Sequence, residues 1–394
     1  METVRARAAM RTLLDAALEA VDPERLTLDA LAGSRDGSVT LIAIGKAAPG
    51  MCRGAAQAVS VLHGLCVTNA TAPVPLGVEL LLGDHPVPAE ASFEAGRRVL
   101  QTARIARGRT IALISGGGSA LCEHPIEGLS ESFVRTVHRA LVRAGASIAE
   151  TNLVRRHLSA IKGGGLAAVT PVPIETYAIS DVCGADPSVI ASGPTVPKEP
   201  DLESALGVMS DHGIELPPGA LAAMRRAAQK PLAHAEPVTL LADGHTAAEA
   251  LAETARGDGL DARVSHGWIH GPLETALDRF LSVAGSGLTV ASGEPEVTVT
   301  GEGTGGRNTH AALLAATRLM DGDAVFAAFA TDGSDGASGS AGAMVDGTTV
   351  QRGGDPSLAL ARCDSATYLA HTGDLLITGP TGTNVADLWL LWRP

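Results

Sequence analysis

The chain has 394 residues, of which 46 are Gly, 3 are Trp, 2 are Tyr and 5 are Phe. Its formal charge of −13 and its few aromatic side chains exclude a general nucleic-acid binder, which needs a basic face and stacking residues. No apolar run approaches the about 20 residues that cross a bilayer, so we expect no membrane association. The five cysteines are scattered without a Cys-x-x-Cys pair, which indicates free thiols in a cytoplasmic protein.

Short β-rich runs alternate with Ala- and Leu-rich helical runs, which is the pattern of an α/β fold with mostly parallel strands. In the first part of the chain the pattern predicts strands at residues 38–45, 64–68, 78–82, 110–115 and 174–180. It predicts helices from residue 47 and at 89–106, 131–143 and 150–168.

A proline-rich stretch at residues 192–237 shows no convincing strand, and we expect a domain boundary near 230–237. A second series follows, with predicted strands at 238–242, 261–264, 288–291, 296–300, 324–330, 375–378 and 387–392. The predicted helices of this series lie at 246–256, 272–284 and 308–320. The sequence therefore predicts two α/β domains, residues 1–235 and 236–394.

Many glycines and polar residues directly follow a predicted strand. They occur in the segments IGKAAPG, ISGGGSAL, ISDVCGADPSVIASGPT, ADGHTAA, ASGEPEVTVTGEGTGGRN, ATDGSDGASGSAGA and ITGPTGTN. A single such glycine usually makes only a tight turn. Ligands of open α/β sheets bind beyond the carboxyl ends of the strands, where backbone N–H groups stabilise anions. The recurrence of the pattern favours a shared anion-binding site.

Standard motifs narrow the chemistry. The chain has neither a Walker A sequence nor the Gly-x-Ser-x-Gly frame of a nucleophile elbow. Gly301, Gly303 and Gly306 match the Gly-x-Gly-x-x-Gly pattern of dinucleotide-binding folds. The acidic residues about 20 positions further on precede the next strand instead of ending it, which argues against a ribose-binding role and hence against an NAD site.

Charged residues beside the glycine loops suit phosphoryl transfer, which needs cations around the phosphates and carboxylates for Mg²⁺. Lys46 at a strand end beside Gly45 is poorly explained by packing. Arg307 lies at a helix start, where the helix dipole disfavours a cation unless an anionic ligand is present. Asp332 can bind a metal or simply make a turn with its own backbone.

Eight motifs in order then show a resemblance that covers nearly the whole chain. They are IGKAAPGM (44–51), GDHPVP (83–88), ISGGGSAL (114–121), TNLVRRHLSAIKGGGLA (151–167), ISDVCGADPSVIASGPT (179–195), GEGTGGRNTHAALL (301–314), ATDGSDGASGSAGA (330–343) and GDLLITGPTGTNVADL (373–388). The chain resembles the class II glycerate kinases, which carry a C-terminal MOFRL domain. The resemblance implies a Rossmann-like N-terminal domain, a mixed-sheet α/β C-terminal domain, and an active site in the cleft between them.

The resemblance also implies ATP-dependent phosphorylation of D-glycerate to 2-phosphoglycerate. The family lysine of the GKA motif falls on Lys46 and the arginine of the GGRN motif on Arg307, which we expect to contact substrate or phosphate. We expect further substrate or phosphate contacts from Ser115, Gly116, Gly117, Gly118, Ser119, Arg156, Lys162, Gly305, Gly306 and Asn308. We expect Mg²⁺ at Asp181 or Asp186, with Asp332 as a further ligand. Thr309 and His310 stand where the family often has Gln-Glu.

Alternative functions stay open at this point. They are an NAD(P)H-dependent hydroxypyruvate reductase, a kinase for another small hydroxy acid, and a non-catalytic protein that senses a nucleotide or a phosphosugar. The phosphoryl donor, the general base and the oligomeric state are open as well, with a homodimer among the options.

Overall fold

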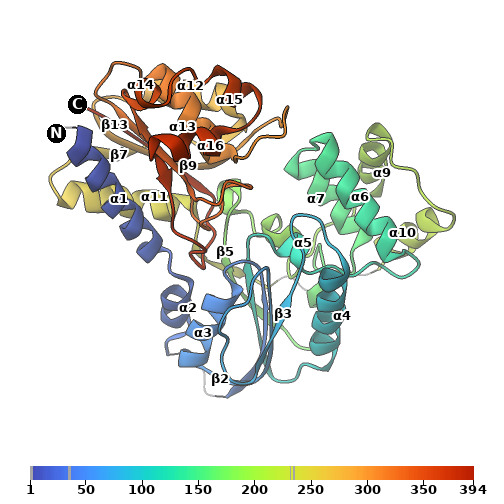
Figure 1. Cartoon of the computed structure of the whole chain (residues 1–394). Coiled ribbons are helices and arrows are strands. Elements are labelled where there is room, and N and C mark those ends of the chain that lie inside the picture. The colour runs from blue at the N-terminus through green and yellow to red at the C-terminus, as the bar shows by residue number, and fades with distance from the viewer. Residues whose placement is uncertain (1–2, 34–36, 231, 234–235) are drawn as a thin grey trace. The chain divides into compact units, whose positions relative to one another are not determined.

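The computed structural model describes residues 3–33, 37–230, 232–233 and 236–394. The chain divides into two compact units (Figure 1). The parallel-sheet unit contains Pro23–Ser180 and Gly184–Leu241, and the mixed-sheet unit contains Met1–Asp22, Asp181–Cys183 and Ala242–Pro394. None of the helices among the described residues is long and apolar enough to cross a membrane.

The parallel-sheet unit is built on a six-stranded sheet with the order β3-β2-β1-β4-β5-β6. Its strands are β1 (Ser38–Ile44), β2 (Ser60–Thr68), β3 (Val78–Leu82), β4 (Arg109–Ser115), β5 (Ile174–Ile179) and β6 (Val238–Ala242). The pairs from β3 through β5 are parallel. This is the strand order of a Rossmann sheet, whose direction of winding reverses between β1 and β4.

The central strands β1 and β4 are almost entirely buried, as expected for apolar runs covered on both faces. Helix α3 packs on one face of the sheet and α4 on the other (Figure 1). The helices of this unit are α2 (Pro23–Leu31), α3 (Ala48–Ala58), α4 (Glu90–Ile105), α5 (Gly118–Leu121), α6 (Glu131–Ala144), α7 (Ile148–Leu158), α8 (Gly165–Val169), α9 (Leu202–Asp211) and α10 (Ala220–Ala228). Two 3₁₀ helices, η1 (Cys183–Ala185) and η2 (Ile190–Ser192), follow β5.

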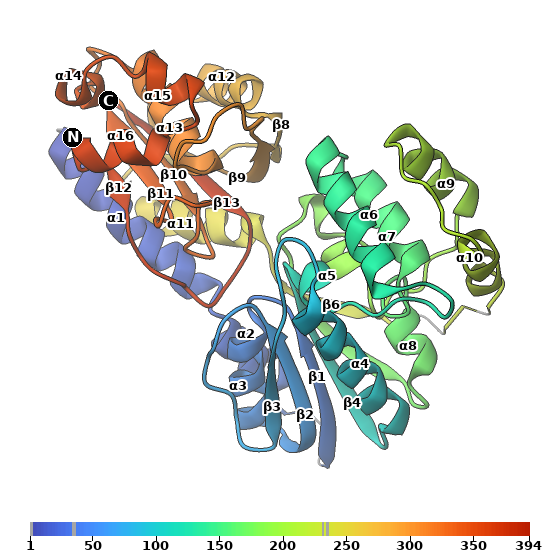
Figure 2. The same cartoon turned by 45° about the vertical axis from the view of Figure 1, so that its right-hand side comes forward.

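Helices α6, α7, α9 and α10 form a second layer of this unit around a core of their own (Figure 2). Val134 and Val137 of α6, Val154 of α7, Met209 of α9 and Met224 of α10 are buried together there. The apolar stripe of α6 recurs at three- and four-residue intervals, which is the reason the segment forms an amphipathic helix. This packing fixes α7, whose other face turns toward the loop after β4.

The mixed-sheet unit contains a sheet with the order β12-β11-β10-β13-β9-β7, to which β8 adds by pairing with β9. Its strands are β7 (Ala262–Val264), β8 (Ile269–Pro272), β9 (Gly287–Glu296), β10 (Val325–Ala330), β11 (Gly342–Asp346), β12 (Leu375–Leu376) and β13 (Asp387–Arg393). Its helices are α1 (Thr3–Ala20), α11 (Gly244–Gly257), α12 (Leu273–Val283), α13 (Arg307–Arg318), α14 (Thr349–Gly353), α15 (Ser357–Ala361) and α16 (Ser365–Thr372).

Strand β13 pairs antiparallel with both β9 and β10, whereas β7 and β8 run parallel to β9. Phe280, Phe326 and Trp389 pack edge to face at centroid distances of 5.7 to 6.2 Å in the core under α12 and α13. Three of the few aromatic residues of the chain are thus used in this one core.

The N-terminal helix α1 belongs to the mixed-sheet unit, although it is far from that unit in sequence. It packs along α11 (Figure 2), and Arg7 forms ion pairs of 2.6 Å with Asp346 and 2.8 Å with Asp374. Arg352 also pairs with Asp374, so the carboxylate joins α1 to α14. The buried face of α1 therefore packs in the mixed-sheet unit, although α1 precedes the parallel-sheet unit in the chain.

Several expected elements differ from the observed ones. The expected boundary between residues 235 and 236 differs from the observed division after Leu241, because β6 pairs with β5 and completes the first sheet. The helix expected at 150–168 ends at Leu158 and resumes at Gly165, with Gly163 and Gly164 at positive φ between the two parts. The strands expected at 288–291 and 296–300 are one strand, β9, which ends at Glu296.

Candidate active site

The loops after β1 and β4 meet at the position where the winding of the parallel sheet reverses. Backbone N–H of Lys46 donates to the carbonyl of Gly116 at 2.9 Å, and that of Ala47 donates to Ser115 Oγ at 3.0 Å. Gly45 has a φ of +133°, and a Cβ there would lie 2.1 Å from Ser115 Oγ, so only glycine fits. The buried Ser115 hydroxyl thus joins the two loops.

The side chain of Lys46 lies over the GGGS loop, which comprises residues 116–119. A Cβ on Gly117, whose φ is +80°, would lie 3.2 Å from Lys46 Cγ and 3.6 Å from His85 Cδ2. A Cβ on Gly118 would lie 2.8 Å from Ala191 Cβ. The glycines let the lysine and the backbone of the loop approach each other, which is the arrangement of residues that phosphate-binding loops use.

Ser119 ends the GGGS loop and lies in a chain of hydrogen bonds. Ser192 Oγ donates to Asn152 Oδ1 at 2.5 Å, and Ser119 Oγ lies 2.9 Å from Ser192 Oγ. Because the Ser192 proton points to Asn152, Ser119 donates to Ser192. Arg155 Nη1 donates to Ser119 Oγ at 3.3 Å. Arg155 of α7 and Ser192 of η2 therefore both form hydrogen bonds with the hydroxyl of Ser119.

A buried carboxylate, Glu123, lies close to this chain. Lys162 Nζ donates to Glu123 Oε2 at 2.5 Å, and His138 Nε2 lies 3.3 Å from the same oxygen. Burial works to raise the pKa of Glu123, but Lys162 lowers it to about 2. Burial lowers the pKa of His138 to about 4. Lys162, an expected phosphate ligand, is 3% exposed, and its charge is already compensated by Glu123.

Arg156 and Asp186, two further expected site residues, influence each other on the same unit. Burial lowers the pKa of half-buried Arg156, while Asp186 works to raise it. Asp186 accepts hydrogen bonds from the N–H of Ser188 at 2.8 Å and from its Oγ at 2.9 Å. Burial works to raise the pKa of Asp186, but the Ser188 hydrogen bonds lower it overall.

Arg307, the first residue of α13, is held by two carboxylates of the mixed-sheet unit. Its Nε and Nη2 donate to Asp387 at 2.5 and 3.2 Å, and its Nη1 donates to Glu294 at 2.6 Å. Burial works to lower the pKa of Arg307, but Asp387 raises it above the ordinary value. The anion expected beside this cation is therefore supplied by the protein, while two of the five guanidinium N–H donors stay available to a ligand.

The backbone at the start of α13 is occupied by Asp335. The buried Asp335 carboxylate accepts the N–H groups of Asn308 and Thr309, each at 2.8 Å. Thr309 Oγ1 accepts the N–H of Gly306 at 2.8 Å, so Thr309 completes the cap of the helix. A phosphate bound by the Asn308 N–H would have to compete with the Asp335 carboxylate, and one bound by the Gly306 N–H would have to compete with Thr309 Oγ1. A dinucleotide pyrophosphate meets the same obstacle.

The other glycines of this segment pack against protein. A Cβ on Gly305 would lie 2.5 Å from Ser365 Oγ, and Cβ atoms on Gly301 and Gly303 would each lie 2.5 Å from the carbonyl oxygen of Arg362. Their spacing therefore reflects close packing on residues 362–365.

Burial raises the pKa of Asp387 to about 6 although Arg307 works to lower it, so the carboxylate beside Arg307 is ionised at pH 7.

The three aspartates expected to hold Mg²⁺ do not form one cluster. Asp181 and Asp332 belong to the mixed-sheet unit and Asp186 to the parallel-sheet unit. Asp181 accepts from Asn384 Nδ2 at 2.9 Å, and the carbonyl of Asp332 accepts from Thr381 N–H at 3.4 Å. Within the described ranges no group of three His, Cys, Asp or Glu residues could hold a metal. The carboxylate of Asp332 accepts the N–H of Ser334 at 2.9 Å, so this residue makes the turn with its own backbone that the sequence also allowed. Mg²⁺ needs only one or two carboxylates when phosphates complete its shell.

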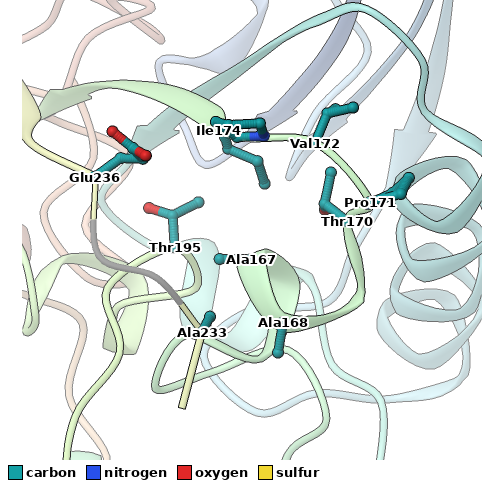
Figure 3. Close-up of a pocket in the computed structure, with 10 residues that line it drawn as sticks. Ala167, Ala168, Thr170, Pro171, Val172, Ile174, Thr195, Ala233 and Glu236 are labelled. Atoms are coloured by element: carbon teal, nitrogen blue, oxygen red, sulfur yellow. The ribbon is translucent and has the colours of Figure 1, made fainter. Parts of the chain in front are cut away.

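A pocket of about 320 Å³ lies at the opposite, amino-terminal end of β5 (Figure 3). Its lining comes from α8, the segment before β5, Thr195, Ala233 and Glu236. Backbone and aliphatic groups dominate this lining, and none of the expected site residues takes part. We assign the chemistry to the strand-end loops because the charged groups are there.

Four residues of these arrangements escaped the sequence prediction, namely Glu123, Arg155, Asp387 and Asp335 in its capping role. Two of them carried a signal. Glu123 stands directly after the apolar end of the GGGSAL segment, and Asp387 directly before the apolar run of β13. Burying a charged side chain at the end of an apolar run costs free energy unless it is paired, so such a residue is a candidate for a buried ion pair.

Comparisons with known proteins agree with this architecture. The family model described as "Domain of unknown function (DUF4147)" matches residues 9–225, and the "MOFRL family" model matches residues 287–387. The "D-glycerate 2-kinase" of Thermotoga maritima is 35% identical, over 94% of this chain and 94% of its own. A crystal structure of a glycerate kinase from the same organism has a TM-score of 0.86 at 32% identity and covers 99% of this chain and 100% of its own.

One similar protein carries the name of a different activity, that of a reductase. The "Putative hydroxypyruvate reductase" of Agrobacterium vitis is 37% identical, over 98% of this chain and 94% of its own.

Proposed function

The chain belongs to the class II glycerate kinases with a C-terminal MOFRL domain, and on that premise we propose that it phosphorylates D-glycerate to 2-phosphoglycerate with ATP. The observation that carries the proposal is the position of Lys46 over the GGGS loop, where the winding of a Rossmann-order sheet reverses. A cation and glycine backbone at that point suit the phosphates of a nucleotide.

The two units contribute different groups to the proposed reaction. In the parallel-sheet unit, N–H groups of residues 116–119 hold the ATP phosphates, with Ser119 assisting, and Lys46 neutralises charge on the transferring phosphoryl group. In the mixed-sheet unit, the two donors of Arg307 that Asp387 and Glu294 leave unused bind an anion, which we propose to be the glycerate carboxylate or a phosphoryl group. Arg307 is pre-oriented for this because Asp387 and Glu294 fix its guanidinium plane.

Asp181 and Asp332 would hold Mg²⁺, and the ion would supply additional charge stabilisation to the phosphates. The carboxylate of Asp181 accepts from Asn384 and the backbone carbonyl of Asp332 accepts from Thr381, so both residues contact the segment 381–384. Asp186 is the weaker choice because the Ser188 hydrogen bonds already use both of its carboxylate oxygens.

The reductase alternative has less support. Its sequence basis is the glycine pattern at 301–306, whose glycines pack on residues 362–365, and whose helix start is capped by Asp335. A pyrophosphate placed there would lie against a buried carboxylate. We therefore expect no oxidation of NADH when hydroxypyruvate is added.

A coupled assay with ATP, Mg²⁺, D-glycerate and enolase, without phosphoglycerate mutase, tests the proposed function. Immediate formation of phosphoenolpyruvate is the expected result, because enolase accepts the 2-phosphate product directly. A signal that appears only after the mutase is added would mean phosphorylation at the 3-position and would contradict the proposed product. ATP-independent loss of NADH with hydroxypyruvate would favour the reductase.

A further inference from the structure

Arg155 of α7 is a buried cation that forms no ion pair with the residues that the structure describes. The residue is 8% exposed, and its Nη1 donates only to the neutral hydroxyl of Ser119. Its Nε is buried and has no hydrogen-bond partner in the part of the chain that the structure describes. Among the same residues, its guanidinium takes part in no ion pair, although the charge of Glu123 works to raise its pKa.

The charge of Arg155 has no hydrogen-bonded counter-ion among the described residues. Glu123 accepts a hydrogen bond from Lys162 at 2.5 Å and acts on Arg155 only through its charge, without an ion pair. Burial lowers the pKa of Arg155 to about 10 although Glu123 works to raise it, so the guanidinium is charged at pH 7. A buried charge without a hydrogen-bonded counter-ion is costly, which points to an anion as a further partner.

The geometry shows where such an anion would lie. Arg155 contacts the last residue of the GGGS loop, and the preceding Gly117 and Gly118 present no side chain that would block an approach. Lys46 crosses the same loop at Gly117. The neighbouring Arg156 is different, because it packs on Gly163 and is influenced by Asp186. Arg155 is thus the arginine that contacts the loop, and the expected role of Arg156 in binding phosphate stays a prediction.

We propose that Arg155 is an anion-binding residue whose guanidinium, oriented by Ser119, pairs with a phosphate group of the nucleotide on the GGGS loop. The inference rests on the proposed function, in which that loop receives ATP. Arg155 adds a second cation beside Lys46 and, unlike a lysine, can donate two parallel hydrogen bonds to phosphate oxygens.

The full-length Arg155→Met variant tests the inference, because methionine keeps an unbranched side chain and a good helix propensity while it removes the charge. We expect the KM for ATP to rise at least about ten-fold and the KM for glycerate to change less than about three-fold. Without ligand, the melting temperature should stay the same or rise, since an unpaired buried charge has been removed. Arg139→Met, on the exposed face of α6, is the matched control and should behave like the wild type.

Binding of ADP, measured by calorimetry and by the shift in melting temperature, separates this inference from the proposed function because it needs no turnover. ADP should bind and stabilise the wild type, and it should do so at least about ten-fold more weakly in Arg155→Met, with Arg155→Lys between them. That result supports the inference even if the wild type fails to phosphorylate glycerate.

Three results would overturn it. The first is undiminished ADP binding by Arg155→Met together with a lower melting temperature, which would make Arg155 a purely structural residue. The second is a rise in the KM for glycerate alone, which would make the bound anion the substrate carboxylate. The third is the absence of ADP binding by the wild type.

Discussion

Lys46 and Arg307 carry the same charge, but the protein holds them by different means. Lys46 lies across a glycine loop, whereas Arg307 is fixed by Asp387 and Glu294. A lysine at a loop can adjust to a moving phosphoryl group, and a guanidinium held by two carboxylates offers a fixed set of donors. Removing each residue should therefore affect activity similarly and stability differently.

Lys46→Ala and Arg307→Ala should each lower kcat/KM by at least about 100-fold, because each removes a few kcal/mol of charge stabilisation in the transition state. Arg307→Ala should also lower the melting temperature, since it leaves the buried Asp387 carboxylate without its partner. Lys46→Ala should melt within about 2 °C of the wild type. Steady-state kinetics and calorimetry measure both effects, and near-wild-type kinetics in both variants would refute the assignment.

His138 should make the protein sensitive to acid. Its folded pKa of about 4 lies below the ordinary value of 6.5, because burial disfavours the charged ring. Between these two pH values the unfolded chain binds the proton and the folded chain does not. The stability due to the neutral ring is complete above pH 6.5 and is lost as the pH falls toward 4, by up to about 3 kcal/mol.

Urea unfolding of His138→Gln and the wild type between pH 7.5 and 4 measures this contribution. The variant should be less stable at pH 7.5 but should lose less stability on acidification. The exposed His245 of α11 provides the control, since His245→Gln should keep the wild-type slope. Parallel curves for His138→Gln and the wild type would show that the ring does not titrate as inferred.

At the scale of elements, the start of α13 depends on a residue that is distant in sequence. Asp335 lies in the loop after β10, and it accepts two N–H groups at the start of the helix. A carboxylate at this end is favoured by the helix dipole as well as by its hydrogen bonds. Because α13 also presents Arg307, the cap connects the stability of the helix with the position of that side chain.

Asp335→Ala should therefore destabilise the protein by about 2–3 kcal/mol, because it leaves two buried N–H groups without an acceptor. Asp201→Ala is a matched control, since Asp201 caps the exposed start of α9 with a single bond of 3.1 Å, and it should cost about 1 kcal/mol or less. Urea unfolding compares the two variants. Equal losses would mean that the Asp335 cap contributes no more than an exposed one.

At the scale of the whole molecule, α1 belongs to a unit whose other elements lie much later in the sequence. It precedes the parallel-sheet unit in the chain but packs on α11 of the mixed-sheet unit, where Leu13 is 2% exposed. Helix α1 (Thr3–Ala20) is thus a part of the mixed-sheet unit. A substitution in the apolar face of α1 should therefore lower the stability of that unit.

Leu13→Ala should destabilise the mixed-sheet unit by about 2–4 kcal/mol through the loss of buried volume. Hydrogen exchange should accelerate in β9, β10 and β13 while β1 and β4 stay protected. Thr12→Ala, on the exposed face of the same helix, should leave exchange unchanged. Faster exchange confined to β1 and β4 would mean that α1 stabilises the other unit.

The sequence by itself determined the class of fold, the presence of two α/β units and the loops that carry the candidate site residues, because these features are local. Buried strands appear as continuous apolar runs, and glycines mark the turns that follow them. The alternation of strands and helices then predicts a mostly parallel sheet, and Lys46 and Arg307 could be singled out from their positions at a strand end and a helix start.

Only the tertiary structure decided which charges are already compensated. Lys162 meets Glu123 across 39 positions, Arg307 meets Asp387 across 80, and Asp335 reaches the helix that begins at Arg307. Such pairs depend on strand order and helix packing, which local pattern does not encode. For the same reason Arg155, indistinguishable from Arg156 in the sequence, stands out only when the burial and the partners of each guanidinium are known.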